Sequence, residues 1–356
     1  MNISAYYRIP PELTDRIIDF LHGDAPSLRV CCLTCRSWLP SSRFHLFYSV
    51  KLDAACKYQA FDQLLRCSPY LGPYVKEFIL DMPPHPPDTL FMSIARRLGA
   101  VKLLRIQGWA RHVDQDTFAA IGPVTDMTIW ASFSHLSDLV ALLNAYPHLE
   151  KLTLWSVMCG RDHISVPENR VPFSTLRQLR MDGGNETVSS KLFTRPLPSL
   201  EALSLTAYNA VDLSALCRLL DDIGSSLHDL DISIWYRVQD IDDSVARLAN
   251  SLNNCPKLRT IDIASSSLAW TAQILPQVTQ AERIALSTRH SHIYDLDCLA
   301  GLLSEAHFPR LRSLTFHFGS SHHYENTTRS RQWIQAAMKK RFAGLHARGI
   351  LSISFS

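Results

Sequence analysis

The residue pair with the clearest chemical potential is Cys32 and Cys35, which form a C-x-x-C motif near the start of the chain. This spacing occurs in redox-active dithiols and in one half of a four-ligand zinc site. No second C-x-x-C and no histidine pair at zinc-finger spacing follows it. The close pairs His290/His292 and His322/His323 lack carboxylates or cysteines at ligand spacing. We therefore expect structural cysteines, surface histidines, no metal and no cofactor.

Known catalytic motifs are absent from the sequence. It contains no G-x-x-x-x-G-K-[ST], G-x-S-x-G, H-E-x-x-H or G-x-G-x-x-G. We therefore predict no catalytic residues and a role other than that of an enzyme.

Composition excludes several other classes. The 356 residues carry 36 Lys and Arg against 33 Asp and Glu, a net charge of +3 that is too balanced to indicate nucleic-acid or membrane-surface binding. No long uncharged apolar run and no signal-peptide pattern is present, and the nine cysteines are scattered. We expect reduced thiols and a location in the cytoplasm, the nucleus or both.

One template recurs from residue 75 onward, an apolar pattern of the form L-x-x-L-x-L. Leucine supplies 49 residues of the chain, and each match predicts a short strand whose apolar residues point into a core. The eleven matches begin 23 to 39 residues apart, at Val75, Val101, Val124, Leu149, Leu176, Leu200, Leu227, Leu258, Ala281, Leu311 and Ile350.

Helical patterns lie between the predicted strands, for example over 136–143, 213–220, 245–252 and 296–303, and a longer one ends at Arg341. A strand and a helix in each repeat cannot bury their apolar faces alone, so neighbouring repeats must stack. This part of the chain resembles leucine-rich repeats. The resemblance implies an irregular α/β solenoid over 75–356, with parallel strands on a concave face and helices on a convex face.

The first fifty residues have a different pattern, typical of three short helices. Pro11 suits the first turn of a helix, and Leu13, Ile17, Phe20 and Leu21 then form one apolar stripe. A second helix is predicted over 28–39, ended by Pro40, and a third over 44–50. We expect a helical domain over 1–52 and a linker helix over 53–74.

This N-terminal segment resembles an F-box in its Pro-x-Glu-Leu, Ile-x-x-x-Leu and Cys-x-x-Trp elements at matching intervals. The resemblance implies docking to a Skp-type adaptor and, through it, to the cullin and RING subunits of a ubiquitin ligase. The positions that match the motif, and that should carry adaptor contacts or the motif's own core, are Pro10, Pro11, Leu13, Ile17, Leu21, Leu33, Cys35 and Trp38.

Residues between the apolar positions of each strand should point outward and form columns across the sheet. Trp130 and Trp155 occupy the same position of adjacent repeats, so we expect the two indoles to be neighbours. Exposed tryptophans with arginines nearby are typical of binding hot spots, although a loop or the C-terminal helix could equally cover them. The predicted substrate-binding residues are Arg105, Trp109, Trp130, Trp155, Arg180, Asp182, Tyr208, Asp231 and Trp235.

These features together predict a receptor that holds a protein substrate for a Skp–cullin–F-box (SCF) ubiquitin ligase and performs no chemistry itself. Two alternatives remain open at this point. One is a repeat scaffold for protein interactions whose N-terminal segment is only a cap. The other is a regulator of a GTP-hydrolysing enzyme that supplies Arg105 or Arg180.

Overall fold

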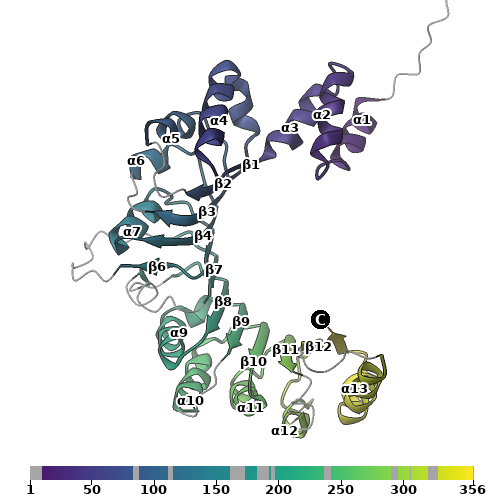
Figure 1. The fold of residues 1–356 in the computed structure, drawn as a ribbon. Helices are drawn as coiled ribbons and strands as arrows, with labels where there is room; N and C mark the ends of the chain where they lie inside the picture. The colour runs from purple at the N-terminus through teal and green to yellow at the C-terminus, as the bar shows by residue number, and fades with distance from the viewer. Residues whose placement is uncertain are drawn as a thin grey trace, which may run out of the picture. The chain divides into compact units, whose positions relative to one another are not determined.

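The computed structural model describes residues 10–82, 88–110, 115–160, 173–182, 192–193, 197–235, 242–289, 296–304, 306–319 and 328–355. The chain divides into two compact units, the first formed by 1–149 with 160–162 and the second by 150–159 with 163–356. We describe each unit by itself (Figure 1). No helix in the described ranges is long and apolar enough to cross a membrane.

The first unit begins with three short helices, α1 (Pro11–Asp19), α2 (Ala25–Thr34) and α3 (Leu39–Tyr48). Pro11 occupies the first turn of α1, as the sequence predicts. The predicted end of the second helix is wrong, because α2 ends at Thr34 and Pro40 lies in the first turn of α3. Proline is tolerated in a first turn, where its missing N–H has no partner to lose. Asp24 begins α2 by accepting a hydrogen bond from the Ser27 amide at 3.1 Å.

The strands of the first unit are β1 (Ser49–Leu52), β2 (Glu77–Met82), β3 (Leu103–Ala110) and β4 (Asp126–Phe133), which pair in parallel in this order. Their connections are α4 (Ala55–Cys67), η1 (Pro69–Tyr74), α5 (Asp88–Ala95) and α6 (Gln115–Ala119), and α7 (Leu136–Asn144) follows β4. The sheet thus begins at Ser49, directly after α3 and ahead of the first predicted strand, whose match begins at Val75. The predicted division at residues 52 and 75 stays a prediction.

A polar cluster joins the helices of the first two repeats. The buried carboxylate of Asp62 on α4 accepts a hydrogen bond from Ser93 Oγ of α5 at 2.5 Å and lies 2.8 Å from Arg66 Nε. Arg97 Nη1 donates to the same serine hydroxyl at 2.6 Å and lies 3.6 Å from the carboxylate. Two cations and a hydroxyl therefore offset the cost of burying one negative charge.

The second unit contains a parallel sheet in the order β5, β7, β8, β9, β10, β11, β12, β13, and a short strand β6 (Met158–Cys159). The strands span Lys151–Leu154, Gln178–Met181, Ala202–Ala207, Asp229–Ile234, Thr260–Ser265, Arg283–Arg289, Ser313–Gly319 and Leu351–Phe355, respectively. All eleven predicted strands are therefore present across the two units.

Helices pack against one face of this sheet (Figure 1). The α-helices are α9 (Ala210–Ile223), α10 (Asp242–Ser251), α11 (Leu268–Ile274), α12 (Asp297–Ala300), α13 (Thr328–Arg341) and α14 (Ala343–Ala347). The 3-10 turns are η2 (Gly224–Ser226), η4 (Leu252–Asn254) and η5 (Leu275–Gln277). The predicted helix over 296–303 is shorter than expected and ends at Ala300.

The burial of side chains in the repeat strands agrees with the expected alternation of strand residues between two faces. In β8 and β9 every second residue is buried, and the apolar residue two positions before each strand, such as Leu200 and Leu227, is fully enclosed. Backbone bonds tie successive repeats together at this turn: the Arg177 carbonyl accepts from the amides of both Glu201 and Ala202, at 2.8 and 3.0 Å. The same pair of hydrogen bonds to one carbonyl recurs in the following repeats. The turns are therefore held by main-chain groups, without a regular row of asparagine side chains.

Candidate functional site

Helix α1 places an apolar stripe on the molecular surface. Leu13, Ile17 and Phe20 follow the i, i+4, i+7 spacing of one helix face, and all three are exposed, Phe20 by 86%. The side chains that α1 buries are Thr14 and Ile18, and Ile18 is 0% exposed. The stripe predicted from the sequence therefore exists, and it points away from the core of the three-helix unit.

Helix α2 repeats this arrangement. Leu28 and Cys31 are buried, whereas Val30 and Leu33 are exposed, Leu33 by 88%. A small helical unit that leaves its large apolar side chains in water, while burying neighbouring positions, has the composition of a docking surface. We call Leu13, Ile17, Phe20, Val30 and Leu33 the apolar helix face.

The remaining positions of the F-box-like motif are more varied. Pro10 and Pro11 are exposed at the start of α1, and Leu21 and Trp38 are half-buried. Cys35 is exposed and lies 3.1 Å from Ser37 Oγ, and this hydrogen bond lowers the pKa of the Cys35 thiol.

The two cysteines of the C-x-x-C motif are both free thiols. Burial raises the pKa of Cys32, so its thiolate is disfavoured. Within the described ranges, no three ligating side chains gather in a way that could hold a metal ion. His290, His292, His322 and His323 lie outside those ranges.

The exposed face of the second unit's sheet carries the predicted columns in register. Arg180 on β7 is the Cα partner of Ser204 on β8, which pairs with Asp231 on β9, which pairs with Asp262 on β10. We call these four residues the charged row. It reads as one cation, one hydroxyl and two carboxylates on successive strands, so positive and negative groups occupy opposite ends.

Aromatic side chains lie beyond the carboxyl ends of three strands of this sheet, β5, β8 and β9. The Arg180 guanidinium carbon sits 4.8 Å from the centroid of the Trp155 ring, a cation–π contact. The Tyr208 hydroxyl donates to Asp182 Oδ1 at 3.3 Å, and the Asp182 charge contributes, after burial, to raising the pKa of Tyr208. Trp235 is exposed on the next strand connection, where its amide bonds the Ala207 carbonyl at 3.1 Å. We call Trp155, Tyr208 and Trp235 the aromatic rim.

The two carboxylates of the charged row lack a paired cation among the described residues. Asp231 accepts a hydrogen bond from Ser204 Oγ at 2.8 Å, while the buried Oδ1 atom of Asp262 has no hydrogen-bond partner in that set. Burial raises the pKa of Asp262, the adjacent Asp231 charge raises it further, and His317 opposes the shift. The structure thus holds two like charges side by side, which is unfavourable unless a cation reaches them.

The candidates on the first unit are less connected. Arg105 Nε lies 2.8 Å from Glu77 Oε1 on the neighbouring strand, so its charge is neutralised locally. Trp130 is 61% exposed at β4. The side chain of Trp109 lies outside the described part of the structure. Trp130 belongs to the first unit and Trp155 to the second, so the predicted contact between the two indoles stays a prediction.

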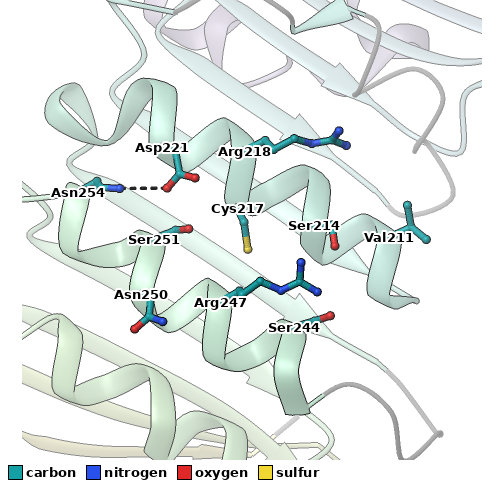
Figure 2. Close-up of a pocket in the computed structure, with 10 residues that line it drawn as sticks. All are labelled: Val211, Ser214, Cys217, Arg218, Asp221, Ser244, Arg247, Asn250, Ser251 and Asn254. Atoms are coloured by element: carbon teal, nitrogen blue, oxygen red, sulfur yellow. Dashed lines mark hydrogen bonds between the residues drawn. The ribbon is translucent and has the colours of Figure 1, made fainter.

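A hollow lies on the helical side of the second unit, between α9 and α10 (Figure 2). It has a volume of about 770 Å³, and its lining includes Arg218, Arg247 and Asp221, the last hydrogen-bonded to Asn254 at 3.0 Å. Burial raises the pKa of Cys217 at its centre, so that thiol is a poor nucleophile. The hollow therefore offers polar contacts, and its cysteine is not activated.

Three residues of these surfaces are not among the predicted site residues. Phe20 belongs to the predicted stripe but matches no F-box position, and Val30 is apolar at a helix position with no motif. Asp262 lies between the apolar positions of its strand and has no predicted role. The predicted strand register could have identified Asp262, because it places this residue opposite Asp231 on a half-buried face. Two neighbouring carboxylates in such a place need a cation to offset their repulsion.

Successive parallel strands, with helices on one face and a polar, aromatic opposite face, define an α/β solenoid like that of leucine-rich-repeat proteins. One similar solved structure is the leucine-rich repeat-containing protein LegL7 from Legionella pneumophila, with a TM-score of 0.43 and 16% identity, covering 76% of this chain and 91% of that one. Another is the complex of Rad7 and Elc1 in yeast, with a TM-score of 0.38 and 12% identity, covering 89% and 91%. No family model matches the chain, and no curated protein does.

Proposed function

We propose that this protein is the substrate-recognition subunit of an SCF-type ubiquitin ligase. The observation that carries the proposal is the apolar helix face of α1 and α2, where five large side chains meet water. Fully burying such a side chain is worth about 1.5–3 kcal/mol, so a partner that covered this face would gain several such contributions. A Skp-type adaptor is the partner that the F-box-like spacing of these helices implies.

The exposed face of the second unit's sheet is the proposed substrate surface. Its aromatic rim and charged row combine the side chains that dominate protein interfaces. The receptor would act by proximity, because holding a substrate near an activated ubiquitin raises the effective concentration of the substrate's lysines. Such a role needs no catalytic side chain and fits a protein of the cytoplasm or nucleus.

The test is capture of a purified Skp-type adaptor by the full chain. We expect wild type to retain the adaptor, and the double variant Leu13→Asp/Ile17→Asp to lose it while its circular dichroism spectrum is unchanged. The control is Val211→Asp, which places one such charge at another exposed apolar helix position. Failure of folded wild type to bind would overturn the proposal and favour the scaffold without a ligase role.

A further inference from the structure

The charged row and the aromatic rim border a common strip of small side chains. Along β8, β9 and β10, the residues two positions after the charged row are Thr206, Ser233 and Ala264, which are neighbours in the strand register. Thr206 and Ser233 are half-buried, and Ala264 is buried. Tyr208 and Trp235 follow Thr206 and Ser233 on the far side of this strip. A chain lying across the strands above the small residues would have charged groups along one side and aromatic rings along the other.

The charges fix what such a chain must carry. Arg180 is exposed and, apart from its stacking on Trp155, has no ion-pair partner among the described residues. Asp231 and Asp262 repel each other and also lack a paired cation in that set. Complementarity therefore calls for an acidic group opposite Arg180 and a basic group opposite the two carboxylates.

The spacing follows from the sheet. Neighbouring strands are about 4.8 Å apart, which puts Asp231 about 10 Å and Asp262 about 14 Å from Arg180, measured across the sheet. An extended chain advances about 3.4 Å per residue, so these distances correspond to about three or four residues.

We propose that the substrate-binding face of the second unit recognises an extended protein segment that crosses β7 to β10. The segment carries an acidic residue and a basic residue about three or four positions apart, with apolar or aromatic side chains directed at Tyr208 and Trp235. This inference rests on the proposed function, in which the same face holds a protein substrate.

The experiment is selection of a random twelve-residue peptide library, displayed on phage, against the immobilised full chain. We expect enriched peptides to contain an acidic and a basic residue at this separation. Against Arg180→Glu, the acidic position should become basic in the enriched set. Against Asp231→Lys, the basic position should become acidic. The matched controls are Arg310→Glu and Asp222→Lys, which change exposed charges outside the row by the same amounts and should leave the selected pattern unaltered.

A binding titration with the best synthetic peptide gives the quantitative check. Arg180→Glu should weaken binding about tenfold, and replacing the acidic residue of the peptide by lysine should restore it, because the pair is then reversed. Arg180→Gln, which removes the charge without reversing it, guards against a folding defect and should give an intermediate loss. Enrichment of no peptide, or of peptides whose charge order ignores both variants, would overturn the inference.

This result is separable from that of the adaptor test. The sheet variants should still capture the adaptor, since the apolar helix face lies on α1 and α2 of the first unit. Peptide selectivity without adaptor binding would leave the segment inference standing and remove the ligase role. Adaptor binding without charge-dependent peptide selectivity would leave the ligase role standing and overturn the segment inference.

Discussion

The guanidinium of Arg180 lies over the ring of Trp155, with 4.8 Å between its central carbon and the ring centroid. The tryptophan thereby holds a long, flexible cation in one place on the exposed face of the sheet. Fixing the rotamers of Arg180 before a partner arrives reduces the entropy that binding must overcome.

This contact should be measurable in the free protein. In a double-mutant cycle of Trp155→Ala and Arg180→Ala, we expect a coupling free energy of about 0.5–1 kcal/mol, the usual value for an exposed cation–π pair. Urea denaturation followed by circular dichroism gives the four free energies of unfolding. A parallel cycle of Arg180→Ala with Trp333→Ala on α13 should show no coupling. Equal coupling in both cycles would mean that the Trp155 contact contributes nothing specific.

Asp262→Asn should stabilise the protein at neutral pH. The raised pKa of Asp262 means that the folded state disfavours its charged form, so wild-type stability falls as pH rises from the ordinary value of 3.8 through the raised folded value. Removing one of two like charges on paired strands should gain about 0.2–1 kcal/mol at pH 7. The gain should shrink towards zero as the pH falls below 3.8, because Asp262 is then protonated in both the folded and the unfolded state. Thermal melts across this pH range measure the gain, with Asp222→Asn as the exposed control. A gain in stability that did not depend on pH would contradict an electrostatic origin.

Adjacent residues of α1 should differ sharply in their effect on stability. Ile18→Ala removes a fully buried side chain and should cost about 2–5 kcal/mol, whereas Ile17→Ala removes an exposed one and should change stability by about 0.5 kcal/mol or less. Because both substitutions remove the same atoms from the same helix, the comparison isolates burial. Similar costs at the two positions, measured by chemical denaturation, would show that the apolar helix face is covered in the free protein.

Gly122→Ala should destabilise the first unit. Gly122 has φ of +74°, and a Cβ there would lie 2.8 Å from the Gly99 carbonyl carbon and 2.9 Å from the Leu98 carbonyl oxygen. Left-handed strain and a backbone clash together should cost more than about 1 kcal/mol. Gly99→Ala is the control, because a Cβ at that position meets no atom within 4 Å. Thermal denaturation that showed Gly122→Ala to be neutral would mean that the turn adjusts freely.

The repeat strands were the most predictable part of the fold. The template L-x-x-L-x-L names three inward positions at fixed spacing. Burial of Leu203 and Leu205 follows directly from strand alternation, and Leu200 is buried in the turn that precedes the strand. Strand β1 escaped detection although Phe47, Val50 and Leu52 fit the L-x-x-L-x-L template, because the third helix predicted over 44–50 claims most of the same residues. Its place in the sheet comes from pairing with β2, a contact between segments distant in the sequence.

Helix orientation was harder to predict. Leu13 and Ile17 form a regular apolar stripe, and periodicity alone assigns such a stripe to a core. In the structure Thr14 and Ile18 face inward, and Leu13 and Ile17 are exposed. The spacing of apolar residues therefore predicted a helix face correctly, but it could not predict whether the protein's own core covers that face. The candidate site shows the same limit: outward columns followed from the template, whereas the stacking of Arg180 on Trp155 required side-chain positions.

The order of strand pairing in the second unit has a mechanical consequence. Strands β8 to β12 each pair with the strand that precedes and the strand that follows in the chain, so each added repeat closes onto the previous one. Tension applied along the chain would therefore peel repeats away from one end and would not shear the whole sheet at once. Each release would free about 25–30 residues, or about 80–100 Å of extended polypeptide. A solenoid of this kind would lengthen in steps under load, while the repeats that were still folded kept their part of the exposed sheet face.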